Sequence, residues 1–169
     1  MVKLIGIAVI LIVSALIGNH CAENLAKRTS TLKAVDYMLE EMELLIRFRA
    51  ANVYEIIDSL HNDPQLEKLD FIKYAAEHSD ENIPFDRLWE KSISEYNKSS
   101  LKAEDTALIE SIGKDIGKSD LEGQISIIKL KKNELSALIK NSEKEYTGKA
   151  GMYRSIGILG GAFISILLV

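Results

Sequence analysis

The sequence predicts an all-α, membrane-anchored helical bundle with two long antiparallel helices, about three short helices and one transmembrane segment at each end. Three observations support this fold class. Only two of the 169 residues are proline, and apolar residues recur every three or four positions over most of the chain. The longest uncharged runs lie at the two ends, and 47% of the chain is hydrophobic, which is ample for the core of one domain.

The first uncharged run is long enough to cross a bilayer. Leu4 to Ala22 holds 19 residues without a charge, which at about 1.5 Å per residue matches the hydrocarbon thickness. A cleaved signal peptide is the alternative, because Lys3 precedes the run. The residues before Cys21 do not form a lipoprotein cleavage site, and no A-x-A site follows. We therefore expect an uncleaved transmembrane segment over residues 1–22.

The second uncharged run reaches the C-terminus. Ser155 to Val169 is 15 residues long, which is short for a full span, so we expect a segment over residues 152–169 with Arg154 extending to the interface. Basic residues lie beside both segments, on the side of each that faces the middle of the chain. Because basic residues next to membrane segments are enriched on the cytoplasmic side, they predict that residues 23–151 form a cytoplasmic helical bundle. They are Lys27, Arg28, Lys33, Lys144, Lys149 and Arg154.

A heptad pattern of apolar residues begins at Leu25 and continues to Leu60. It predicts a single helix from the membrane to about Leu60, with Arg28 and Arg49 as polar interruptions of the apolar stripe. Asp63 before Pro64 predicts a new helix start, and this helix is expected to continue to about His78.

Three further helices are predicted after a break at SDENIP, residues 79–84. Pro84 opens one whose apolar stripe contains Trp89, which we expect in the core. A polar linker at residues 96–100 separates it from a helix that starts near Leu101. The last helix continues towards the second apolar segment, and a flexible point is expected at Gly148 and Gly151.

The stretch SIGKDIGKSDLEGQ, residues 111–124, contains three of the ten glycines. A phosphate-binding loop requires four residues between its first glycine and the Gly-Lys-Ser/Thr, and a preceding strand; the spacing here is one residue too short and the flanks are helical. We therefore interpret the stretch as a helix-to-helix turn, with Gly117 as a left-handed C-cap and Ser119 and Glu122 as a capping box. Gly113 and Gly123 would let the two flanking helices approach closely. The predicted turn, also a candidate interaction surface, comprises Gly113, Gly117, Ser119, Asp120, Glu122, Gly123 and Gln124.

Small residues recur every four positions in both apolar segments, a spacing that allows close helix contact in lipid. Two interpretations remain open: the two segments pack on each other as a hairpin, or they assemble with other membrane subunits. The residues concerned are Ser14, Gly18, Gly157, Gly161 and Ser165.

No combination of residues predicts catalysis, a metal or a cofactor. The net charge of −4 argues against nucleic acid, and nothing points to a small-molecule substrate. His20, His61 and His78 lack partners at metal-ligand spacing, and the single cysteine, Cys21, lacks a nearby base and allows no internal disulfide. An acidic cluster at residues 40–43 is expected to be a solvated face, with a docking patch as the alternative.

The chain resembles the stage III sporulation protein AB family of endospore-forming bacteria over essentially its full length. Three stretches carry the resemblance: KLIGIAVILIVSALIG at the start, SIGKDIGKSDLEGQ in the middle and MYRSIGILGGAFISILLV at the end. The segment from Gly117 to Gln124 is the most specific of these. The resemblance implies a helical domain similar to those of the type II secretion inner-membrane platform protein, although Lys114 replaces a glutamate of that protein's turn.

The resemblance also implies a function. The chain would be a non-enzymatic platform in a secretion or feeding-tube complex of the mother-cell membrane around the forespore, required for spore development. Its implied partners are a secretion-type cytoplasmic ATPase, other membrane subunits of the sporulation complex and the lipid bilayer. The alternative is a membrane-tethered sensor or signalling helical module, because long helices leaving a membrane can transmit motion.

Overall fold

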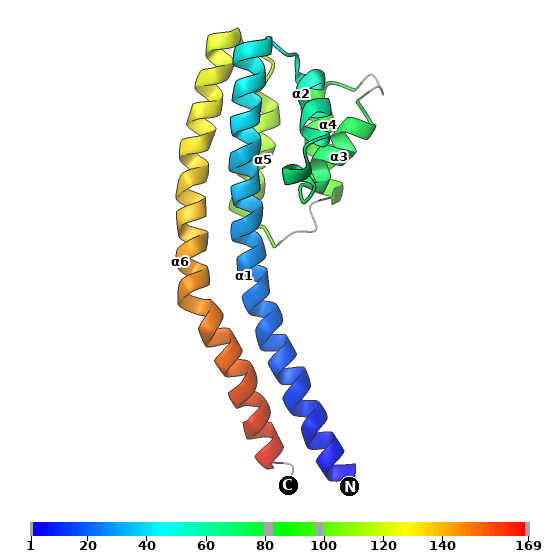
Figure 1. The fold of residues 1–169 in the computed structure, drawn as a ribbon, viewed down its shortest axis with the longest axis vertical. Helices are drawn as coiled ribbons and strands as arrows, with labels where there is room; N and C mark the ends of the chain where they lie inside the picture. The colour runs from blue at the N-terminus through cyan, green and yellow to red at the C-terminus, as the bar shows by residue number, and fades with distance from the viewer. Residues whose placement is uncertain (1, 80–82, 97–99, 168–169) are drawn as a thin grey trace. The chain divides into compact units, whose positions relative to one another are not determined.

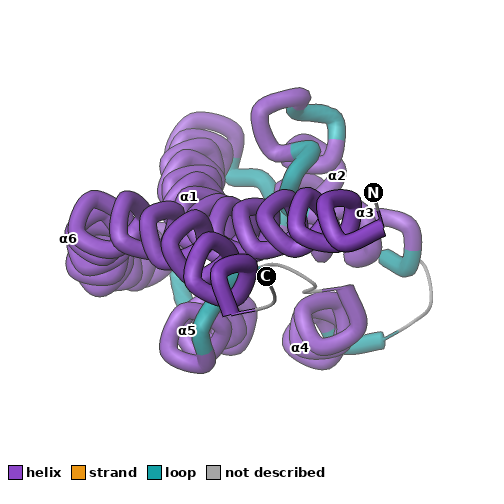
Figure 2. Tube along the Cα trace, turned by 90° about the horizontal axis from the view of Figure 1, so that it is seen from below, coloured by secondary structure: helices purple, strands orange, loops and turns teal. Residues whose placement is uncertain are grey.

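The fold was determined as a computed structural model, which describes residues 2–79, 83–96 and 100–167. All regular structure in this part of the chain is helical (Figures 1 and 2), as the sequence predicts. Parts of the predicted break at residues 79–84 and of the predicted linker at residues 96–100 lie outside the described residues. The chain divides into two compact units: residues 1–29 with 140–169, and residues 30–139.

Two helices, α1 (Val2–Arg49) and α6 (Leu121–Leu167), are the longest elements. Each contains all or most of one of the uncharged runs, and each is long and apolar enough to cross a membrane. Gly148 and Gly151 lie inside the continuous α6, so the structure does not support the expected flexible point there. In the unit of residues 1–29 and 140–169, the two helix segments run antiparallel, because Asn19 contacts Arg154 while Arg28 contacts Glu145.

The unit of residues 30–139 adds four short helices to its parts of α1 and α6. These are α2 (Val53–His61), α3 (Asp70–Glu77), α4 (Phe85–Tyr96) and α5 (Ala103–Asp115). Along the chain, α2 packs on α3, α3 on α4 and α4 on α5. One apolar core joins all of them to α1 and α6, and it includes Leu39, Ile72, Trp89 and Ile128. Trp89 is fully buried, as predicted.

The first long helix ends earlier than the heptad pattern predicts. It stops at Arg49, and Ala50 takes a left-handed conformation with φ +48°. Asn52 then starts α2 through a capping box with Glu55: the Asn52 side chain accepts the Glu55 amide at 3.1 Å and the Glu55 carboxylate accepts the Asn52 amide at 3.0 Å. The pattern of apolar residues continues across the break because α2 also needs one apolar face, and this is why periodicity alone missed it.

The helix predicted to start at Pro64 is also divided. Asp63 caps it as expected, accepting a hydrogen bond from the Gln65 amide at 2.8 Å. The first turn, Pro64–Leu66, is a 3₁₀ helix, and the α-helix proper begins at Asp70. Leu66 and Leu69 are both buried, so this short segment carries two side chains into the core.

Candidate functional site

The predicted turn between α5 and α6 is centred on Gly117. This residue has φ +80°, the left-handed conformation that the sequence predicts for it. It follows the C-cap Ile116, whose amide donates to the Ile112 carbonyl at 3.1 Å. A Cβ on Gly117 would lie only 2.8 Å from Cγ1 of Val53. Both the backbone and the packing therefore restrict this position to glycine.

Asp120 caps α6, in place of the predicted capping box of Ser119 and Glu122. The Asp120 carboxylate accepts a hydrogen bond from the Gly123 amide at 2.9 Å, and the helix begins at Leu121. The third helical residue is thus Gly123, which has no side chain to return the bond. Ser119 contributes its carbonyl instead, which accepts a hydrogen bond from Nε2 of Gln124 at 3.1 Å.

Gly113 contacts a different helix from the one predicted. A Cβ at this position would overlap Cγ and Cδ1 of Trp89 in α4, so it is α4, and not α6, that approaches here. The Trp89 indole also donates a hydrogen bond to the Ile109 carbonyl of α5 at 2.8 Å. Gly123 is close only to its own turn, at Ser119 and Asp120. The expectation that Gly113 and Gly123 serve α5–α6 contact is therefore incorrect.

The two lysines of the turn face carboxylates of α4. Lys114 lies 3.9 Å from Glu90, and Lys118 lies 3.6 Å from Asp86. The ammonium group of Lys118 is thus directed towards α4. These four side chains are 40–59% exposed, so the pairs stabilise the fold little. The turn is closely packed and both of its lysines face carboxylates. It is therefore poorly suited to bind a phosphate group.

The small residues of the apolar segments bring α1 and α6 into contact within their unit. A Cβ on Gly18 would lie 3.0 Å from Cα of Gly157 and 2.6 Å from the Tyr153 carbonyl oxygen. The Ser14 hydroxyl donates to the Gly157 carbonyl at 2.5 Å, and Gly161 faces Ser14 one turn further on. Ser165 donates to the Gly161 carbonyl of its own helix at 2.8 Å. The hairpin interpretation accounts for these contacts, because the faces with small residues meet each other.

An ion pair joins the same two helices beyond the uncharged runs. Arg28 Nη1 lies 3.1 Å from Glu145 Oε2, with the Arg28 side chain 3% exposed and the Glu145 side chain 19% exposed. Lys149 reaches the other oxygen of Glu145 at 2.9 Å. The nearby carboxylate raises the pKa of Lys149 by hydrogen bonding and by charge attraction. Arg28 interrupts the apolar stripe of α1, and its partner Glu145 on α6 accounts for a cation at this position.

A shallow hollow of about 390 Å³ lies where α2 turns into α3. Its lining includes the apolar residues Leu60, Leu66 and Leu69 and the polar or charged residues His61, Asp63, Glu67 and Lys73. Tyr37 of α1 donates to Asp63 at 2.9 Å and accepts from Gln65 at 3.1 Å. The hydrogen bond to Asp63, with burial and neighbouring carboxylates, raises the pKa of Tyr37 to about 12. No sequence motif points to this hollow.

The remaining side chains considered in the sequence are dispersed. Of the acidic cluster, Glu40 pairs with Lys132 at 2.8 Å and Glu43 with Arg47 at 2.6 Å. Within the described ranges, no group of three or more His, Cys, Asp or Glu side chains is placed to hold a metal ion. His78 stacks on Tyr74, with ring centroids 3.9 Å apart.

Comparison with known proteins gives one match. A family model described as stage III sporulation protein AB matches residues 3–169. No curated protein and no solved structure matches the chain.

Proposed function

The chain belongs to the stage III sporulation protein AB family, and we propose that within sporulation it acts as a non-enzymatic membrane platform that docks other proteins. The family places the chain in stage III of sporulation. The finer role is our inference, and one observation carries it. Both α1 and α6 pass without a break from an uncharged run into the packed unit of residues 30–139. A protein-binding unit held by two continuous helices is a suitable anchor for an assembly.

We further propose that residues 23–151 face the cytoplasm of the mother cell, in the membrane around the forespore. The basic residues next to both uncharged runs support this orientation. The partners would then be a secretion-type cytoplasmic ATPase and other membrane subunits of the sporulation complex. The outer surface of the unit of residues 30–139, including the hollow between α2 and α3, would contact them.

A capture experiment tests the platform role. The tagged full-length chain is solubilised in mild detergent from sporulating cells, after brief crosslinking, and co-purification of the ATPase encoded alongside is measured by immunoblot. An unrelated membrane protein with the same tag is the control. We expect retention of the ATPase by the chain alone. Equal recovery with both baits, at matched expression, would contradict the proposal.

Reporter fusions test the orientation. Alkaline phosphatase, which is active only outside the cytoplasm, is fused either after Val169 or within residues 96–100. We expect activity for the C-terminal fusion and none for the internal one. A fluorescent protein that folds only in the cytoplasm should give the reverse pattern. The opposite result would place the helical unit outside the cytoplasm and exclude a cytoplasmic ATPase as its partner.

A further inference from the structure

We propose that three lysines next to the uncharged runs, Lys27, Lys144 and Lys149, bind the headgroups of anionic phospholipids. We name them the membrane-proximal lysines. The first observation is a separation of charge along the chain. Residues 1–29 and 140–169 carry seven basic and three acidic residues, a net charge of +4. Residues 30–139 carry 14 basic and 22 acidic residues, a net charge of −8.

The contacts between α1 and α6 place two of these lysines at one level. Asn19 contacts Arg154, and Arg28 contacts Glu145. These contacts are nine residues apart on each helix, so the helices stay in register between them. Lys27 is five residues beyond Ala22, the last residue of the first run, and Lys149 is five residues before Arg154. Both therefore lie within one turn of the same level.

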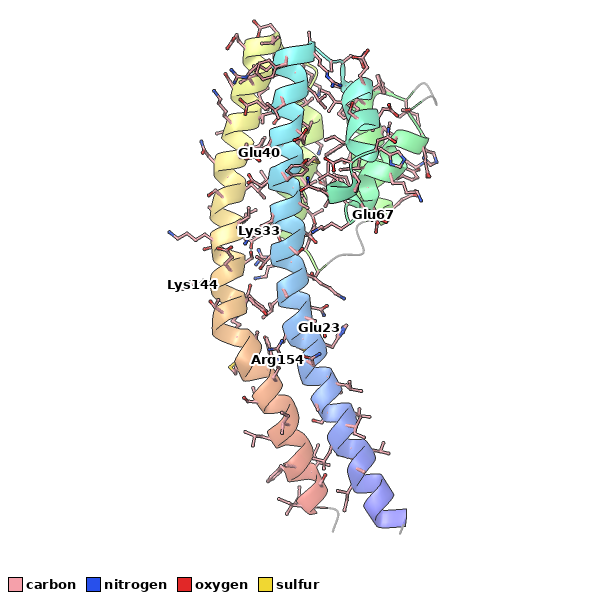
Figure 3. All side chains as sticks on the ribbon, in the orientation of Figure 1. Glu23, Lys33, Glu40, Glu67, Lys144 and Arg154 are labelled. Atoms are coloured by element: carbon pink, nitrogen blue, oxygen red, sulfur yellow. The ribbon has the colours of Figure 1, made fainter. Side chains whose placement is uncertain are left out.

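That level matches the headgroup layer. Five helical residues correspond to about 7.5 Å, and the polar layer on each side of a bilayer is about 5–8 Å thick. Lys144 is a further five residues away, about 15 Å along the helix from Arg154. Its long side chain shortens this separation, and the screening length of about 8–10 Å at physiological salt lets its charge attract headgroup phosphates. Figure 3 shows Arg154 on the side of α6 that faces α1, where it contacts Asn19, and marks the position of Lys144 further along the helix.

The membrane-proximal lysines retain positive charge for a ligand. All three are exposed. Glu145 is the carboxylate contacted by Lys149, and it is shared with the buried Arg28, so the three groups together keep one positive charge. Among the described residues, neither Lys27 nor Lys144 forms an ion pair. Nearby Glu23 accepts a hydrogen bond from Asn19 at 2.6 Å.

A lipid headgroup is the partner favoured by position. Positive side chains immediately beside a membrane segment are the usual pattern for binding anionic lipids. An acidic protein is the competing partner. It has no comparable reason to meet these lysines at the level where the uncharged runs end. The inference depends on the membrane placement in the proposed function, and its test keeps the two separate.

The full-length chain is reconstituted in nanodiscs of phosphatidylcholine and phosphatidylglycerol mixed 7:3. Lipids that remain bound after ejection of the chain are counted by native mass spectrometry. The variant combines Lys27→Gln, Lys144→Gln and Lys149→Gln. A control with the same change in charge combines Lys73→Gln, Lys114→Gln and Lys129→Gln, all exposed and all in residues 30–139.

Among the lipids retained by the unmodified chain and by the control, we expect phosphatidylglycerol to be enriched about two- to fivefold over its bulk ratio to phosphatidylcholine. The enrichment should be smaller at high salt. The variant should retain lipids at the bulk ratio. Incorporation without enrichment, or an equal loss in the control, would overturn this proposal alone. Failure of the chain to enter nanodiscs of any composition would overturn the membrane placement and this proposal together.

Discussion

The indole ring of Trp89 lies directly on Gly113, at the place where any other residue would carry its Cβ. This contact brings α4 against α5, and the hydrogen bond from the indole to the Ile109 carbonyl fixes the ring. Phe71 and Phe85 pack on the same ring, with centroids 5.4 and 5.7 Å away. The glycine-rich stretch therefore serves two contacts: Gly117 turns the chain towards α6, and Gly113 receives α4.

Substitution of Gly113 by alanine should destabilise the helical unit. The added methyl group would overlap the Trp89 ring, and α4 must move to relieve the overlap. After the better helix propensity of alanine is counted, we expect the free energy of unfolding to fall by about 2 kcal/mol. Thermal unfolding of the full chain in detergent, followed by circular dichroism, measures the effect. Gly148→Ala is the matched control: nothing lies within 4 Å of that position, so it should raise stability by up to about 1 kcal/mol. An unchanged melting curve for Gly113→Ala would exclude the Trp89 contact.

Substitution of Gly117 by valine should also lower stability, for a different reason. A β-branched residue at φ +80° costs about 1–3 kcal/mol, and its Cβ would meet Val53. Gly117→Asn tests the backbone term, because asparagine tolerates the left-handed region better than valine. The midpoint of thermal unfolding can be read from the fluorescence of Trp89, the single tryptophan. This midpoint should fall less for the asparagine variant than for the valine variant. Equal losses would assign the whole effect to the Val53 contact.

Ala50 provides the opposite case. It is the one non-glycine residue with positive φ in the described part of the chain, and a left-handed conformation costs alanine about 1 kcal/mol. Ala50→Gly should therefore raise the free energy of unfolding by a few tenths to about 1 kcal/mol, after the entropy of glycine in the unfolded chain is counted. Ala51→Gly, without that strain, should lower it. A loss of stability in both variants would show that Ala50 is unstrained.

The buried Arg28 should be sensitive to loss of its charge partner. Glu145→Gln leaves the guanidinium without its carboxylate, and we expect a loss of about 2–4 kcal/mol in hairpin stability. The double variant Arg28→Met, Glu145→Met should recover most of that loss, because an apolar pair of similar volume can replace a buried ion pair. Thermal unfolding of the two variants in detergent gives the comparison. A double variant that is no more stable than the single one would mean that the pair contributes net stability.

The sequence predicted the helical class and the two uncharged runs because both depend on composition and period, which are local properties. Caps such as Asp63 and the glycine at position 117 were predicted for the same reason. The break at residues 50–52 was missed because α2 continues the heptad spacing. Asparagine also occurs often outside helix caps, so Asn52 alone did not indicate the start of a helix. The partners of Gly113 and Arg28 were missed because each lies on another helix, at a position that spacing along the chain does not reveal.

The close packing of the apolar segments leads to a crosslinking prediction that separates the two interpretations of their small residues. A Cβ at Gly161 would lie 2.9 Å from Cβ of Ser14, so the two helices need to separate by about 1 Å to reach the Cβ distance of about 3.8 Å found in disulfides. With Cys21→Ser in the background, the pair Ser14→Cys and Gly161→Cys should lose both thiols on mild oxidation while the chain runs as a monomer on a non-reducing gel. The pair Gly6→Cys and Gly161→Cys should keep its thiols, because Gly6 has no neighbour within 4 Å. A dimer band for the first pair would show that these faces meet between chains, and the hairpin would then be the wrong interpretation.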